Sequence, residues 1–315
     1  MIKVAIIFGG PGSEHEVSIS SAKNILEHID RTAFDVIEIF VTKDKKYIID
    51  RKTFSEEEGI QEIKNMNVEV VFPIIHGEYG EDGELQSKLE KEKISFIGSS
   101  STTSHLAIDK NKTNEILSKN NLHIPKSKII SIHNKSIDFR FPIIVKPINE
   151  GSSIGLFKIE TEQQYKDSLE AIFENHNEML AQEFVEGREF TCGVIEKEGM
   201  VTSLVATEVI LTKGELFDYE AKYSPAGCEE ITPAQVDTVM MSEIQNIAMT
   251  CHKILGCRTL SRTDLILKGD RLYVLEVNTS PGMTKTSFIP AQAQVCGYSM
   301  KELITILIDS VKYSR

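Results

Sequence analysis

Positive charge is scarce in this chain of 315 residues, which has 35 lysine and arginine residues against 47 aspartate and glutamate residues. Its formal net charge is -12. Proteins that bind nucleic acid present a basic face to the phosphates, so this balance argues against a nucleic-acid partner. The same balance permits a small phosphorylated ligand, because a few local lysines or arginines are enough to hold one.

Long apolar runs are also missing, since no stretch approaches the roughly 18 apolar residues that a membrane span requires. Near the N-terminus only Val4–Phe8 is apolar before Gly9, which is too short for a signal peptide. The cysteines are odd in number and none are in CxxC spacing: Cys192, Cys228, Cys251, Cys257 and Cys296. We therefore expect reduced thiols in a cytoplasmic protein that contacts no membrane.

The overall composition is that of an ordinary globular protein, with 41% hydrophobic and 26% charged residues. The length predicts two or three domains with substantial cores. Internal repeats and coiled-coil heptads are absent from the sequence.

The most informative stretch is residues 258–288. It predicts two strands, Thr259–Leu267 and Leu272–Val277, joined by a tight turn at residues 268–270. The loop that follows, NTSPGMT (278–284), combines rigid and permissive backbone, as a loop does when its amide N–H groups approach a ligand.

Counting outward from that turn places Asp264 within one residue of directly opposite Glu276, and Asn278 follows on the same face. These hard oxygen donors, with no cysteine or histidine among them, suit Mg²⁺ or Mn²⁺ rather than zinc. Arg262 shares the face and adds a cation for a phosphate. The alternative is a hairpin with a charged, solvated face.

The N-terminal residues predict a buried strand at Lys3–Phe8, a glycine turn at residues 9–12 and then a helix. Ser13 and Glu16 have the spacing of a capping box at the start of that helix. Glu14 lies in the mouth of the turn, where a carboxylate suits an ammonium group better than a phosphate. Alternatively, Glu14 only faces the positive end of the helix dipole.

Two further buried strands, Asp35–Val41 and Val68–Ile75, indicate an α/β unit. The second leads into a glycine-rich loop at residues 76–83, at the end of a strand where open α/β sheets bind ligands. His76 in this loop is either a site residue or a loop histidine with a local partner. A short strand at Ser95–Ile97 would complete the unit.

The polar run Ser99–Thr103 predicts the first boundary, and a single helix, Ser104–Asn120, then carries Lys110. The next unit opens with an apolar strand, residues 141–147, that ends near Lys146. The loop NEGSSIG (149–155) returns to a strand and predicts a flap whose backbone donors cover a triphosphate; an exposed hairpin without a ligand is the alternative.

The later elements follow the same reasoning from hydrophobic periodicity. They are the helix Glu162–Glu174, the strands Met179–Val185, Phe190–Ile195 and Val201–Leu211, and the helices Pro233–Leu255 and Lys301–Val311.

Seven motifs stand in an order that resembles the D-alanine–D-alanine ligase family of the ATP-grasp superfamily, over essentially the whole chain. The motifs are GGPGSEHEVS (9–18), HGEYGEDG (76–83), KPINEGSSIG (146–155), EGREFT (186–191), FDYEAKY (217–223), SRTDLIL (261–267) and LEVNTSPGMTKTS (275–287).

This resemblance implies a mixed α/β and α+β architecture, the ATP-grasp fold. An N-terminal Rossmann-like domain with a parallel sheet would be followed by two α+β subdomains that clamp ATP. We expect a substrate domain at residues 1–103, a central ATP-grasp subdomain at 104–186 and a catalytic subdomain at 187–315. The resemblance also implies a homodimer that uses D-alanine and ATP for peptidoglycan precursor synthesis.

Carried over position by position, the resemblance implies three groups of site residues. For ATP they are Lys110, Lys146, Gln182, Glu183, Val185, Glu189 and Lys222. For two Mg²⁺ or Mn²⁺ ions they are Asp264, Glu276 and Asn278. For the two D-alanines and the oxyanion they are Glu14, His76, Ser152, Tyr223, Arg262, Gly282 and Ser287.

In the implied reaction Glu14 holds the ammonium of the first D-alanine, whose carboxylate takes the γ-phosphate of ATP and becomes an acyl phosphate. The second D-alanine, anchored at Ser287, attacks this group. Arg262 and the Gly282 N–H would stabilise the tetrahedral oxyanion.

Two positions depart from the family pattern. Gln182 stands where many relatives have glutamate, so an amide oxygen would contact the adenine amino group. The segment after Tyr223 is shorter than the lid of many relatives, so water could reach the acyl phosphate more easily. Two alternatives stay open: a ligase that makes D-alanyl-D-lactate or D-alanyl-D-serine, and a nucleotide-binding protein without catalysis. The EAKY pattern ending at Tyr223 favours the dipeptide over the depsipeptide.

Overall fold

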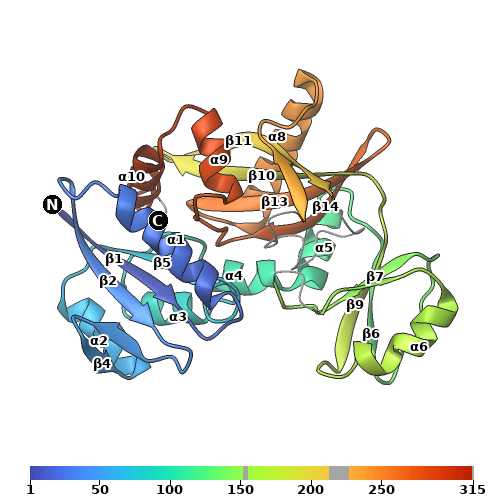
Figure 1. The fold of residues 1–315 in the computed structure, drawn as a ribbon, viewed down its shortest axis with the longest axis horizontal. Coiled ribbons are helices and arrows are strands. Elements are labelled where there is room, and N and C mark those ends of the chain that lie inside the picture. Colours follow the sequence, from blue (N-terminus) through green and yellow to red (C-terminus); the bar gives the residue numbers. More distant parts are fainter. Residues whose placement is uncertain (152–154, 213–226, 314–315) are drawn as a thin grey trace.

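The computed structural model describes residues 1–151, 155–212 and 227–313. They form three β-sheets with helices packed against them (Figure 1). Sheet A lies within residues 2–74, sheet B within residues 127–183 and sheet C within residues 188–278. This mixed architecture confirms the predicted fold class.

Sheet A has the strand order β4-β3-β2-β1-β5. Its elements and the helices around it are β1 (Ile2–Gly9), α1 (His15–His28), β2 (Phe34–Val41), β3 (Tyr47–Ile49), β4 (Lys52–Phe54), α2 (Glu56–Asn65), β5 (Val70–Ile74) and α3 (Glu84–Lys91). Strand β1 lies between β2 and β5 and pairs in parallel with both, as expected for the predicted parallel sheet. The antiparallel strands β3 and β4 were not predicted. Residues 95–97 make only an isolated bridge through Phe96, so the predicted strand there is wrong.

The turn after β1 depends on glycine. Gly9 and Gly10 have φ angles of +97° and +91°, and a Cβ on Gly10 would lie 2.6 Å from Ile75 Cγ2. This turn delays the start of α1, so Glu14 occupies the N-cap and its side chain makes no capping hydrogen bond. The predicted capping box is therefore wrong, because with this N-cap the third helical residue is Val17, which has no carboxylate.

The predicted helix over residues 104–120 is two helices, α4 (Ser101–Ile108) and α5 (Lys110–Lys119). Asp109 interrupts them with an extended ψ of 93°, and its side chain accepts a 3.0 Å hydrogen bond from the N–H of Lys112. Within the polar run at residues 99–103, Ser100 caps α4, which begins at Ser101; the domain boundary expected there stays a prediction.

Sheet B is a smaller antiparallel sheet with the order β6-β9-β7-β8. Its elements are β6 (Ser127–Ser131), β7 (Ile143–Lys146), β8 (Phe157–Ile159), α6 (Glu162–Ile172) and β9 (Glu178–Glu183). Apolar residues of α6, β7 and β9 form a core that belongs to this unit alone.

Sheet C has the order β12-β11-β10-β13-β14. Its elements and helices are β10 (Arg188–Lys197), β11 (Met200–Leu211), β12 (Cys228–Ile231), α8 (Thr238–Leu255), β13 (Leu260–Lys268), β14 (Arg271–Asn278), α9 (Phe288–Val295) and α10 (Met300–Ser310). Helix α8 starts later than predicted, and α9 was not predicted. Helix α8 covers one face of the sheet, whereas α9 and α10 cover the other.

One apolar core joins the first and last parts of the chain. It contains Ile25 of α1, Phe72 of β5, Leu307 of α10 and Met283 of the loop after β14, all buried. Figure 1 accordingly shows α1 beside α10, with both chain ends on the same side. The first sheet is thus packed directly against the last helices. The division at residues 103 and 186 stays a prediction.

Among the helices in the described ranges, none is both long and apolar enough to cross a membrane.

Gln292 offers a test of how α9 is attached to sheet C. Its buried amide donates to Thr191 O at 2.9 Å and Thr207 Oγ1 at 3.1 Å, and accepts from Gly193 N at 2.8 Å. Gln292→Leu keeps the volume but leaves these groups unpaired, so we expect a loss of about 2 kcal/mol in unfolding free energy. Chemical denaturation measures it. The exposed Gln294→Leu is the control and should change stability by less than about 0.5 kcal/mol; equal midpoints for the two variants would refute the expectation.

Candidate active site

The β13–β14 hairpin brings four charged or polar residues onto one face. Asp264 pairs with Glu276 and Arg262 pairs with Asn278. The pairing skips Leu275 at a β-bulge beside Asp264, so Glu276 lies directly opposite Asp264. Simple counting from the turn, which ignores the bulge, is wrong by one residue at this position. Directly opposite side chains have Cβ atoms about 5 Å apart, so this face concentrates charge.

Asp264 is the most constrained of these side chains. Arg262 donates to it from Nε at 2.9 Å and from Nη2 at 2.8 Å, and Thr191 Oγ1 donates at 2.6 Å. Burial opposes the charge on Arg262, but Asp264, Glu276 and Glu81 outweigh it and raise the pKa of the guanidinium further. Arg262 is therefore a permanent cation, and its hydrogen bonds to the described residues use Nε and Nη2, which leaves Nη1 for a ligand.

Two cavities meet at this hairpin. The loop cavity, about 650 Å³, lies between α1 and residues 277–289. The intersheet cavity, about 680 Å³, lies between sheet B and sheet C. Both are lined by Lys110, Glu150 and Glu276, so these three residues mark the junction between the two spaces.

Lys110 reaches the junction because α5 starts with it. The break at Asp109 makes Lys110 the first residue of α5, and its side chain is buried with Nζ donating to the carbonyl of Glu150. Glu150 is the second residue of the loop predicted as a flap (149–155), so this contact ties the start of that loop to α5.

The predicted ATP residues within the described ranges line the intersheet cavity: Lys110, Lys146, Gln182, Glu183, Val185 and Glu189. Lys146 ends β7, and Glu189 belongs to β10, so two different sheets supply this group. Gln182 Nε2 is buried and has no hydrogen-bond partner among the described residues. A buried donor of this kind needs a partner, which a bound ligand can supply.

Glu14 lies at the mouth of the loop cavity, at the N-cap of α1. A Cβ on Gly77 would lie 3.2 Å from Glu14 Oε2, and a Cβ on Gly151 would lie 3.7 Å from the same oxygen. The carboxylate therefore lies between the glycine-rich loop after β5 and the flap after β7.

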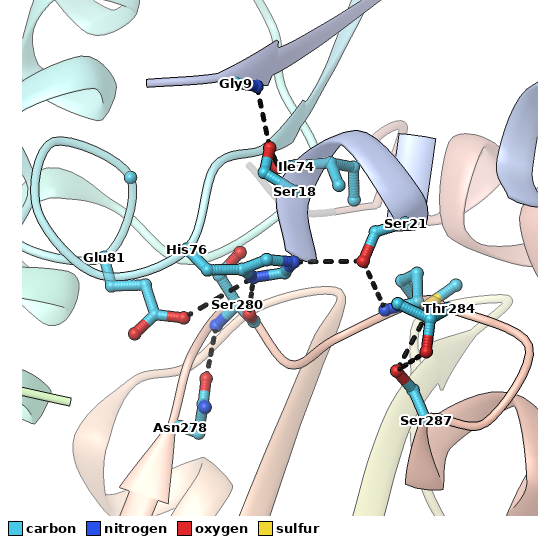
Figure 2. Close-up of polar contacts among 12 residues, drawn as sticks. Gly9, Ser18, Ser21, Ile74, His76, Glu81, Asn278, Ser280, Thr284 and Ser287 are labelled. Carbon is cyan, nitrogen blue, oxygen red and sulfur yellow. Dashed lines mark hydrogen bonds and ion pairs between the residues drawn. The ribbon is translucent and has the colours of Figure 1, made fainter. Parts of the chain in front are cut away.

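His76 connects three segments (Figure 2). Its Nε2 lies 3.1 Å from Ser21 Oγ of α1, and its Nδ1 lies 3.0 Å from the carbonyl oxygen of Ser280. Glu81 Oε1 is 3.8 Å from Nδ1. Burial opposes protonation of the ring, but Glu81 and Glu14 outweigh it and raise the pKa of His76 above its ordinary value.

The loop after β14 carries Gly282 and Ser287 into the loop cavity. A Cβ on Gly282 would lie 2.8 Å from Ser287 Oγ, so only glycine permits this approach without a shift. Ser287 Oγ accepts from Thr284 N at 3.0 Å and lies 2.8 Å from Thr284 Oγ1 (Figure 2). Asn278 Oδ1 accepts from Ser280 N at 2.9 Å.

Three predicted site residues, Ser152, Lys222 and Tyr223, lie outside the described residues.

Sequence reasoning missed Lys158, which lines the intersheet cavity from β8. Its Nζ is 2.6 Å from Glu160 Oε1 and 4.5 Å from the centre of the Phe184 ring. The signal was a lysine inside an apolar strand that follows the flap. Glu81, which lies in the HGEYGEDG motif, was also overlooked as a separate residue.

The donor set on the hairpin fits a hard divalent cation. Among the described residues no three His, Cys, Asp or Glu side chains form a metal-holding cluster, so a metal here would rest on two carboxylates and one amide. Asp264 receives three hydrogen bonds, which leaves a lone pair on Oδ2, and Asn278 Oδ1 also keeps one. Mg²⁺ binds through few protein oxygens when water and phosphate oxygens complete its shell.

The sequence matches two family models, "D-ala D-ala ligase C-terminus" over residues 112–309 and "D-ala D-ala ligase N-terminus" over residues 3–63 and 50–99. A D-alanine–D-alanine ligase of Leptospira interrogans is 33% identical, with 98% of each chain covered. One of Oceanobacillus iheyensis is 35% identical, covering 98% of this chain and 94% of its own.

Among solved structures, the VanG D-Ala:D-Ser ligase of Enterococcus faecalis has a TM-score of 0.85 and 28% identity, over 98% of this chain and 99% of its own. The D-alanine–D-alanine ligase of Bacillus anthracis complexed with ATP has a TM-score of 0.80 and 24% identity, over 99% of this chain and 97% of its own, a likeness that concerns the fold. By family models that span most of its length and by relatives that match it nearly end to end, the chain belongs to the D-alanine–D-alanine ligase family.

Proposed function

We propose that this chain ligates two D-alanines to D-alanyl-D-alanine with ATP, through an acyl phosphate, for peptidoglycan precursor synthesis. The observation that carries the proposal is the junction of the two cavities at Lys110, Glu150 and Glu276. A nucleotide in the intersheet cavity would present its terminal phosphate at this junction. A small substrate in the loop cavity would meet that phosphate there.

Recognition of ATP would divide between the two sheets. Lys146 and Lys110 would neutralise phosphate oxygens, and Glu189 would hold the ribose. Gln182 supports an adenine partner because its amide can donate to a ring nitrogen and accept from the amino group, which would satisfy the unpaired Nε2. This use of the amide adds a donor to the oxygen contact expected from sequence.

The first chemical step would be transfer of the γ-phosphoryl group to the carboxylate of D-alanine. Glu14 would hold the ammonium of this substrate and Lys110 would stand at the phosphate. Asp264, Glu276 and Asn278 would hold two Mg²⁺ or Mn²⁺ ions, which when bound supply charge neutralisation to the phosphates. The protein's own contribution is positioning, because phosphoryl transfer asks little covalent chemistry of its catalyst.

The second step would be attack of the second D-alanine on the acyl phosphate. Ser287 would anchor its carboxylate, and its amine must be neutral to attack. Arg262 and the Gly282 N–H would stabilise the oxyanion; donors of this kind are typically worth about 10²–10³ in rate each. Inorganic phosphate then leaves and the dipeptide remains. A homodimer stays a prediction here.

D-serine is a second candidate for the acceptor. The relative with this activity in its name, the VanG D-Ala:D-Ser ligase, is 28% identical. D-lactate is a weaker nucleophile than the free amine of D-alanine, although it has no ammonium proton to lose before it attacks. We therefore expect it to compete only at low pH.

Substrate choice can be tested in a single mixture. We expect D-alanyl-D-alanine as the main product from equimolar D-alanine, L-alanine, D-serine and D-lactate at neutral pH. L-alanine would exchange methyl and hydrogen, and a displacement near 1 Å can cost about 10²-fold when positioning carries catalysis. Mass spectrometry of the products decides it. A dominant D-alanyl-D-serine or depsipeptide, or an L-containing dipeptide in comparable yield, would overturn the choice of substrate.

Glu276→Gln tests the metal assignment. The variant removes one negative charge from the junction of the cavities and should lower ligase turnover more than about 10-fold, because metal ions at phosphates supply several kcal/mol. Asp270→Asn, at the exposed turn of the same hairpin, is the matched control and should retain turnover. Phosphate release and Mg²⁺ titration give the readouts. A Glu276→Gln enzyme with more than about a tenth of wild-type turnover would contradict the assignment.

A further inference from the structure

The loop that carries Gly282 and Ser287 is held by helix α1 of the first unit. Met283 N donates to Ser21 Oγ at 3.2 Å, and Asn24 Nδ2 donates to Met283 O at 2.8 Å. Two side chains of α1, which lie 262 and 259 positions before Met283, thus form hydrogen bonds with both backbone polar groups of that residue. All three residues are buried, and the Met283 side chain belongs to the apolar core shared by α1 and α10.

Gly282 lies between two held points of this loop. On its N-terminal side, Ser280 is bonded to His76 through its carbonyl and to Asn278 through its N–H. Pro281 fixes its own φ angle, which removes one freedom from the short span. On its C-terminal side, Met283 is held by α1. The direction of the Gly282 N–H is therefore set from both sides.

Ser21 links these two held points (Figure 2). Its Oγ accepts from Met283 N and lies 3.1 Å from His76 Nε2, so this oxygen either accepts from a protonated ring or points its hydroxyl hydrogen at a neutral one. A neutral His76 then carries its proton on Nδ1 and donates to Ser280 O at 3.0 Å. One hydroxyl on α1 thereby orients both the histidine and the Met283 peptide.

Asn24 contributes at a local cost. Its Oδ1 is buried without a hydrogen-bond partner among the described residues, while its Nδ2 holds Met283 O. An unpaired buried amide oxygen costs about 1–3 kcal/mol. The amide is thus a poor choice for stability alone, and its described hydrogen bond is the one that fixes the loop.

We propose that Ser21 and Asn24 are positioning residues for the second half of the reaction: by holding the N–H and C=O of Met283 they aim the Gly282 N–H at the oxyanion and fix Ser287 for the acceptor. The inference rests on the ligase function proposed above. It gives the first unit of the chain a second role, beyond carrying Glu14, in arranging groups that belong to the last unit.

Ser21 and Asn24 should affect the acceptor D-alanine and ATP differently. Neither Ser21 nor Asn24 lines the intersheet cavity, whereas Asn24 lines the loop cavity together with Gly282 and Ser287. Loss of the hydrogen bonds to Met283 should therefore slow the acceptor step and leave the affinity for the nucleotide unchanged. A merely structural role would instead reduce the folded fraction and lower turnover without changing any KM.

The experiment compares Ser21→Ala and Asn24→Leu with wild type in the full chain. Both should raise the apparent KM for the second D-alanine about 10-fold and lower kcat about 10- to 100-fold, the scale of a small displacement. The KM for ATP should stay within about twofold. Phosphate released per dipeptide should rise, because the acyl phosphate waits longer for attack and meets water.

Ser18→Ala is the matched control. Ser18 is a buried serine one turn earlier on α1, whose Oγ accepts from Gly9 N at 2.8 Å and donates to Ile74 O, so its bonds stay within the first unit (Figure 2). This variant should lower the melting temperature by a few degrees, about 2–4 °C per kcal/mol lost, and leave both KM values unchanged. Asn24→Leu removes the unpaired oxygen but also leaves Met283 O without its donor. These two effects on stability oppose one another, so this variant should melt within a few degrees of wild type, and it decides the matter if Ser21→Ala fails to fold.

The outcomes distinguish the proposed ligase function from the positioning role of Ser21 and Asn24. A wild-type chain that forms no D-alanyl-D-alanine would overturn the proposed function itself. A wild-type chain that forms it, with Asn24→Leu showing wild-type KM, kcat and phosphate-to-dipeptide ratio, would overturn the positioning role alone. Equal changes in the KM values for ATP and the second D-alanine would also overturn it.

Discussion

The site depends on the pairing of Asp264 with Glu276 across the β13–β14 hairpin. Two carboxylates at opposite positions repel one another, which costs free energy unless cations lie close by. Arg262 meets this need from the same strand, with two hydrogen bonds to Asp264. The remaining negative charge faces the junction of the two cavities, where a metal and nucleotide phosphates would complete the neutralisation. The same repulsion would favour binding of the metal and the nucleotide that the proposed reaction uses.

The hairpin alone does not make a site, because its partners come from three sheets. The shared apolar core of α1 and α10 fixes the first unit against the last, and this contact sets α1 beside the loop after β14. Sheet B has a core of its own and supplies Lys146 and the flap to the intersheet cavity. The first and last units share a core, whereas sheet B has its own. Movement of sheet B would therefore change the width of the intersheet cavity and leave the loop after β14 in place.

Much of this arrangement could be predicted from local sequence, and the errors have physical causes. Alternation and glycine turns identified β1, β5 and the hairpin, because each signal is confined to a few residues. The bulge at Leu275 left no such signal, since it depends on how two whole strands pair. The break at Asp109 was missed because a helix pattern continues on both sides of it, and only the capping geometry ends α4.

Two buried polar atoms at the cavities have no hydrogen-bond partner among the described residues. They are Gln182 Nε2 and Asn24 Oδ1, each beside one of the two cavities. Local stability would favour apolar side chains at both positions, since an unpaired polar atom is costly in the interior. A ligand in the intersheet cavity would offset the cost at Gln182 by accepting a hydrogen bond from Nε2. Asn24 lines the loop cavity, so a bound group there or the geometry of the loop would offset the second cost, and at Asn24 the demands of folding and function differ.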